Sequence, residues 1–131
     1  MAPLRILIPT LLLVAYVGIV SAAVARERMA ADATPQHPAP AGTPDSHYLV
    51  VALFDATSGA RVDQAEVVAT HLSPRRQPVR RTLSPLRIDD VISFGGESGI
   101  SKGPGHLFEI EARRPGAKPA RFSFGYDNRH Q

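Results

Sequence analysis

Residues 54–67 read FDATSGARVDQAEV, a stretch in which two apolar runs are separated by a turn. Asp55 is a residue that accepts hydrogen bonds from the backbone N–H groups just after it, and Gly59 supplies the positive φ that a tight turn needs. The stretch therefore predicts the corner between two strands, and it requires no catalytic role for Asp55.

Strands are predicted on both sides of this corner. Residues 48–54 read YLVVALF, apolar on both faces, as is typical of a central strand. Residues 62–72 read VDQAEVVATHL and place Ala65, Val67 and Ala69 on one face, with Glu66, Val68 and Thr70 on the other. This period-two alternation indicates a second, half-buried strand.

The C-terminal part shows the same alternation. Residues 105–114 read GHLFEIEARR and residues 121–126 read RFSFGY, with an apolar side chain at every second position. The turn-forming residues PGAKP between them predict a hairpin. Across it, Glu109 and Glu111 are expected to lie opposite Arg121, in ion pairs of about 0.2–1 kcal/mol each.

The segment between these two pairs of strands is less regular. Residues 73–85 predict a charged loop interrupted by proline, residues 86–94 a single strand, and the glycine-rich residues 95–105 a flexible connection. In the domain that these strands form, no helix longer than a turn is expected. About five to seven short strands with turns at this spacing predict a mostly β domain, a small immunoglobulin-like or transthyretin-like antiparallel β-sandwich.

The N-terminus has a secretory layout. Residues 1–25 combine a basic head, an apolar run and small residues, and Ala23 and Ala25 give the spacing that a signal peptidase prefers. The apolar run is also long enough for a helix that crosses a bilayer. Residues 1–25 are therefore predicted to be a hydrophobic helix, either a cleaved signal peptide or a retained membrane anchor.

The chain is predicted to have three parts, of which residues 1–25 are the first. Residues 26–47, rich in Ala and Pro, predict a disordered linker, and residues 48–131 form the β-sandwich domain. Because the domain follows an export signal or an anchor, we expect it in the cell envelope, either in the periplasm or on the periplasmic side of the inner membrane.

Two stretches resemble a known class of exported modules. Residues 54–69, FDATSGARVDQAEVVA, resemble the opening hairpin of transthyretin-like and carboxypeptidase-regulatory-like modules, and residues 105–124 look like their last hairpin. The chain is also similar to small bacterial envelope proteins of unknown function, some of which are suspected of a role in metal handling. The resemblance implies a fold, and modules that bind or brace rather than catalyse. It carries no catalytic residue over to this chain.

Composition excludes several functions. The chain has no Cys, which excludes disulfides, thiolate metal sites and cysteine nucleophiles. Its net charge of +3, without a patterned basic patch, does not indicate nucleic acid. Residues 95–105 lack the Gly-Lys-Ser/Thr order of a phosphate loop. The adjacent Asp89 and Asp90 point to opposite faces of a strand, so they cannot act together as a catalytic acid and base. We therefore expect no enzyme activity.

Histidines and arginines are the remaining candidate site residues. His47, His106 and His130 lie at the ends of predicted strands, which can converge at one rim of a sandwich around copper or zinc. Ordinary exposed or capping histidines are the alternative. The arginines of the central loop are candidates for contact with an anionic membrane surface or an acidic partner, with a solvated loop as the alternative. They are Arg75, Arg76, Arg80, Arg81 and Arg87.

Three functions remain open from the sequence. The leading hypothesis is a non-enzymatic exported β-sandwich that acts by contact with another, unknown protein of the bacterial envelope. The second is a periplasmic accessory protein that binds copper or zinc. The third is a membrane-surface module that uses the basic loop. Nucleic acid is not expected as a partner.

Overall fold

The computed structural model describes residues 13–21, 46–88 and 90–129, which form eight β-strands and no helix. The strands are β1 (Leu13–Ser21), β2 (Ser46–Asp55), β3 (Arg61–Val62), β4 (Glu66–Leu72), β5 (Val79–Ile88), β6 (Val91–Gly99), β7 (Gly103–Arg113) and β8 (Ala120–Asn128). The prediction of a mostly β domain is confirmed.

All the strands belong to one antiparallel sheet, in the order β1-β2-β6-β5-β4-β7-β8, with the short β3 paired to β2. Strand β5 joins the two halves of this sheet. Its first half, as far as Leu83, pairs with β4, and its second half, from Ser84, pairs with β6. Pro85 is tolerated in this inner strand because it lies beyond the last residue that pairs with β4.

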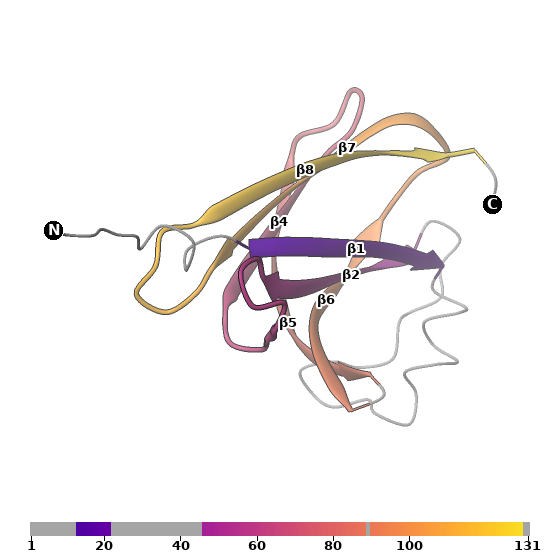
Figure 1. Cartoon of the computed structure of the whole chain (residues 1–131). Coiled ribbons are helices and arrows are strands. Elements are labelled where there is room, and N and C mark those ends of the chain that lie inside the picture. The colour runs from indigo at the N-terminus through magenta and orange to yellow at the C-terminus, as the bar shows by residue number, and fades with distance from the viewer. Residues whose placement is uncertain (1–12, 22–45, 89, 130–131) are drawn as a thin grey trace, which may run out of the picture.

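The sheet curls until it is nearly closed into a barrel, and its arrangement can be followed in Figure 1. β1 and β8 stand at its two ends, yet the inner side chains of both pack against the same apolar core. An immunoglobulin-like or transthyretin-like sandwich is therefore not confirmed. The alternation that predicts half-buried strands is the same in both architectures, so it does not distinguish them.

The core is built from the alternating positions that the sequence indicates. Val67 and Ala69 on β4 are buried, and Phe122 and Phe124 on β8 pack against the same cluster. The fully buried side chains also include Leu53, Val51, Phe94, Phe108 and Ile110. The predicted C-terminal hairpin is confirmed, and Arg121 Nε lies 3.2 Å from Glu111 Oε1, while Glu109 pairs in register with Ser123.

The opening corner forms as its sequence predicts. Asp55 Oδ1 accepts hydrogen bonds of 2.9 Å from the backbone N–H groups of Thr57 and Ser58, and Gly59 has a φ of 76°. Arg114 donates to the other carboxylate oxygen at 2.8 Å. The backbone N–H of Ser58, then Arg114, lower the pKa of Asp55 to about 2. Asp55 is thus a structural carboxylate that stays ionised.

Five local expectations differ from the structure. Residues 62–72, expected as one strand, are divided between β3 and β4, and residues 79–85, expected as part of a charged loop, form the first part of β5. Residues 86–94, expected as one strand, contain a turn at Asp90, whose φ of 65° separates β5 from β6. The glycine-rich stretch is mostly strand, because β6 runs to Gly99 and β7 begins at Gly103. Residues 13–21, predicted as part of a hydrophobic helix, form strand β1. The other residues of that helix, and the predicted linker up to residue 45, lie outside the described residues.

Gly59→Ala is expected to destabilise the domain by about 1–2 kcal/mol, because only the left-handed backbone opposes a side chain there. No atom lies within 4 Å of the added Cβ. Gly99→Ala is the matched control, since its surroundings are equally open and its φ is not positive. Urea unfolding checks both variants. Equal losses in the two would show that the corner does not require glycine.

Candidate metal centre

Polar side chains gather inside one end of the sheet. At this end β2 and β7 begin and β4, β6 and β8 end, because antiparallel neighbours alternate in direction. The inward positions there are polar, whereas the rest of the interior is apolar. The buried polar residues of this end are His47, His71, Ser98, His106 and Asn128.

His71 and His106 are in direct contact. His71 Nε2 lies 3.0 Å from His106 Nδ1, and His106 Nε2 lies 2.8 Å from the carbonyl oxygen of Ser101. A carbonyl only accepts, so His106 Nε2 carries a proton and donates it. In the neutral pair, His106 Nδ1 is then the acceptor, and His71 Nε2–H is the donor. One proton therefore lies between two nitrogens, each of which could ligate a metal.

A β-bulge lies directly before His106 in β7. The register between β7 and β8 shifts between Gly103 and His106, and Gly103 and Gly105 have φ values of 115° and 92°. In register His71 pairs with Phe108, so His106 meets it diagonally, two residues away. A Cβ on Gly105 would lie 2.9 Å from Pro74 Cγ, so glycine is needed here for its φ and for its lack of a side chain.

The environment of His71 keeps its ring oriented and neutral. Its ring stacks on Phe108 with centroids 4.4 Å apart and an interplanar angle of 4°, and Phe108 stacks on Phe124 in turn. The residue is 8% exposed. Burial, followed by the nearby charges of His106, Arg76 and Arg81, lowers the pKa of His71 below 6.5. A neutral imidazole is the form that binds metal.

Asn128 completes the cluster. Its Nδ2 donates to the carbonyl oxygens of Ile100 at 2.9 Å and Ser101 at 3.2 Å, so the Ser101 carbonyl receives both Asn128 and His106. Asn128 Oδ1 is buried and has no hydrogen-bond partner among the described residues. A buried acceptor without a donor is costly, and a water or a cation next to it would remove that cost.

The sequence-predicted ligands are placed as follows. His47 and His106 both face the interior at this end and are 2% and 3% exposed. His130 lies outside the described residues. Within residues 13–21, 46–88 and 90–129, no group of three or more His, Asp or Glu side chains lies close enough to hold a metal ion. That His47, His106 and His130 together bind a metal ion therefore stays a prediction.

His71 is the residue that the sequence analysis did not select. The signal was present, because His71 follows Val67 and Ala69 at even spacing and so belongs to the buried face of the same strand. A histidine on the apolar face of a strand has to find a polar partner inside the fold. The position of a histidine at a strand end, as with His47, does not by itself indicate which polar partner it meets.

The five arginines do not form a single patch. Arg75 and Arg76 lie in the turn between β4 and β5, and Arg80 and Arg81 follow at the start of β5. Arg87 is near the other end of β5, where its Nη1 lies 3.9 Å from Asp90 Oδ1. Contact with an anionic membrane stays a prediction. Arg80 and Arg81 are consecutive residues of a strand, so their side chains point to opposite faces of the sheet.

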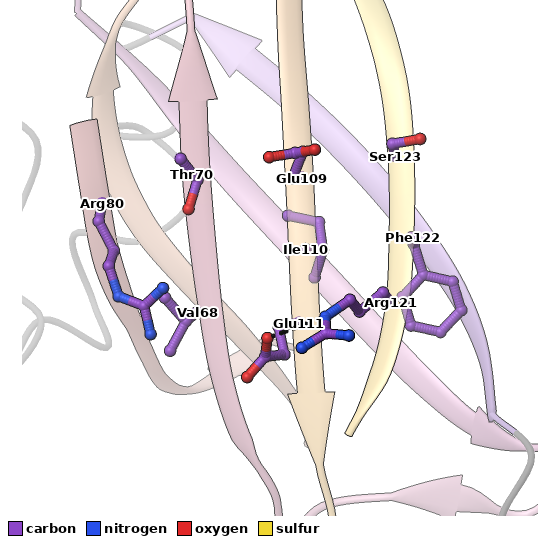
Figure 2. Close-up of a pocket in the computed structure, with 9 residues that line it drawn as sticks. All are labelled: Val68, Thr70, Arg80, Glu109, Ile110, Glu111, Arg121, Phe122 and Ser123. Atoms are coloured by element: carbon purple, nitrogen blue, oxygen red, sulfur yellow. Dashed lines mark hydrogen bonds and ion pairs between the residues drawn. The ribbon is translucent and has the colours of Figure 1, made fainter. Parts of the chain in front are cut away.

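A shallow hollow of about 330 Å³ lies over β4, β5, β7 and β8 (Figure 2). Charges of both signs alternate across it, because Arg80 on β5 and Arg121 on β8 flank Glu109 and Glu111 on β7. Arg121 is already paired with Glu111. A mixed, partly paired sheet face of this kind is ordinary solvated surface, and it indicates no ligand class.

Neither a family model nor a curated protein matches the sequence of this chain. Solved structures do share its fold. A DUF4426 family protein from Pseudomonas aeruginosa PAO1 superimposes with a TM-score of 0.66 at 12% identity, covering 91% of this chain and 92% of that one. At this identity the likeness establishes the fold alone.

Two further similar structures contain copper. A copper-bound variant of FetP from uropathogenic Escherichia coli strain F11 matches with a TM-score of 0.59 at 12% identity, over 88% of this chain and 89% of that one. A copper-bound variant of Campylobacter jejuni P19 matches with a TM-score of 0.51 at 12% identity, over 66% of this chain and 77% of that one.

In the described part of this chain, no helix is long and apolar enough to cross a membrane.

Acid is expected to destabilise the fold through His71. Because its folded pKa lies below the ordinary 6.5, the unfolded chain binds more protons between these two values. The free energy of unfolding should therefore fall as the pH drops below about 6.5, and this group should contribute no pH dependence well above it. Urea unfolding across this range checks the prediction. His71→Gln should flatten the slope and His37→Gln should not, whereas equal slopes in all three proteins would contradict it.

Proposed function

We propose that this chain is an exported, non-enzymatic metal-binding protein of the bacterial cell envelope, and that it binds copper through His71 and His106. The observation that carries the proposal is the buried contact between His71 Nε2 and His106 Nδ1 at 3.0 Å. The copper-bound neighbours of the same fold support the choice of copper, and the secretory layout of residues 1–25 supports export.

The distance between the two nitrogens suits a shared metal. Metal–imidazole bonds of about 2.0–2.1 Å place two ligand nitrogens about 2.9 Å apart when the bonds are at right angles, as in the tetragonal coordination of Cu(II). His71 Nε2 and His106 Nδ1 are 3.0 Å apart, so the distance between them hardly has to change when both bind one metal ion. The ring nitrogens would have to turn toward a common point as the shared proton leaves.

The groups around the pair fit a metal site as well. A ligating histidine generally donates its other ring N–H to a carbonyl or carboxylate, which fixes its tautomer, and Ser101 O does this for His106. Asn128 Oδ1 is a buried oxygen within the same cluster and would supply a third, harder ligand or hold a metal-bound water. His47 and His130 remain candidates for the other positions.

Copper binding tests the proposal. The full chain is expected to bind Cu(II) saturably with one equivalent, and His71→Phe and His106→Gln are each expected to weaken binding by more than about tenfold. His71→Phe retains an aromatic ring that can stack on Phe108, so it removes the ligand with the least disturbance of packing. Competition titration with a copper chelator measures the affinity, and zinc is titrated in parallel.

Three further variants sharpen this test. His37→Ala is the control, because it removes an imidazole from the predicted linker and should leave copper affinity unchanged. His47→Asn shows whether that histidine belongs to the site, and Asn128→Leu removes the buried oxygen. Circular dichroism verifies that each variant remains folded. Absence of saturable binding, or binding that is insensitive to both His71→Phe and His106→Gln, would reject the proposal.

A further inference from the structure

Strand β1 covers one whole edge of β2. Nine residue pairs join them, from Leu13 opposite Asp55 to Ser21 opposite His47. On its other edge β2 pairs with β6 and then with β3. Within the part of the chain that the structure describes, β1 is therefore the sole partner of this edge.

The inner side chains of β1 also shield the core. They pack against the cluster that contains Leu49, Val51 and Leu53 of β2, and they are Leu13, Ala15, Val17 and Ile19. Loss of β1 would thus expose a row of backbone N–H and C=O groups together with apolar side chains. A free edge of this kind pairs readily with another strand.

Export removes β1 from this position. The inference rests on the export stated in the proposed function, because β1 lies entirely within residues 1–25. A cleaved signal peptide leaves the molecule, and a retained anchor lies as a helix in the bilayer. In either case Leu13–Ser21 is no longer available to β2, and the edge from residue 47 to residue 55 needs another partner.

The sequence of β2 does not protect it as a free edge. Residues 48–54 read YLVVALF, with neither a charge nor a proline. Natural edge strands usually carry Lys, Pro or a bulge to prevent unwanted pairing. The composition of β2 is that of an inner strand, so a partner on both sides is required in the exported molecule as well.

We propose that β2 of the exported protein pairs antiparallel with β2 of a second copy of this chain. Two identical strands that pair antiparallel are related by a twofold axis, so each copy offers the same surface to the other. With the axis at Val51, residue 47 lies opposite residue 55 and the pair has the nine-residue length that β1 covers. Leu49 then lies opposite Leu53 of the other copy, so apolar side chains replace those of β1.

The oligomeric state of the exported protein tests this pairing. The full chain is produced with its own N-terminus and recovered from the envelope, in detergent if it is membrane-bound. Its mass shows whether residues 1–25 are present, and light scattering shows whether it is a dimer. We expect a dimer. Ala52→Lys should raise its dissociation constant by more than tenfold, because it places two like charges beside the twofold axis.

The controls separate this inference from the proposed function. Ala56→Lys adds the same charge in the exposed turn after β2 and should leave the dimer intact. A peptide with the sequence of residues 13–21 should restore the β1 pairing and dissociate the dimer, which gives a second readout if Ala52→Lys does not fold. An exported monomer, or a dimer that is insensitive to both Ala52→Lys and the peptide, overturns the inference alone. Retention of the whole chain in the cytosol overturns both the dimer inference and the proposed export. The copper titration tests the metal site independently of either result.

Discussion

The hydrogen bond between the imidazoles of His71 and His106 is the interaction on which the proposed site depends. It lies inside the end of a sheet whose other interior positions are largely apolar. Each ring therefore provides the other with a hydrogen-bond partner that the apolar side chains cannot provide. That requirement fixes the tautomer of His106 through Ser101 and favours the neutral form of His71. A pair arranged in this way is stable without metal, and its one shared proton occupies the place where a metal can bind.

Much of the fold is predictable because most strands either alternate or form a short continuous apolar run. Residues 48–54 form a strand as their continuous apolar run predicts, and residues 105–126 form the predicted hairpin, since side-chain period two follows directly from a half-buried strand. Residues 62–72 are strand only at Val62 and from Glu66 onward. The opening corner is also predictable, because Asp55 and Gly59 act through contacts with their own neighbours in sequence. Local chemistry of this kind needs no knowledge of the rest of the chain.

The features that involve distant residues are not accessible in the same way. β5 divides its pairing between β4 and β6, and alternation alone does not reveal that the sheet curls nearly into a barrel. Residues 13–21 are apolar enough to suit both a membrane helix and a strand, and in the structure they form a strand that pairs with β2. The contact between His71 and His106 joins residues that are 35 apart in sequence, and it forms only because β7 pairs with β4.

The most direct test of the central claim is nitrogen-15 NMR of the histidine rings, recorded without metal and then with the diamagnetic ions Zn(II) and Cu(I). The account predicts that apo His106 carries its proton on Nε2, and that addition of metal shifts His71 Nε2 and His106 Nδ1 together to the values of ligating nitrogens. A proton on His106 Nδ1 in the apo protein, or metal addition that leaves both of these nitrogens unchanged, would contradict it.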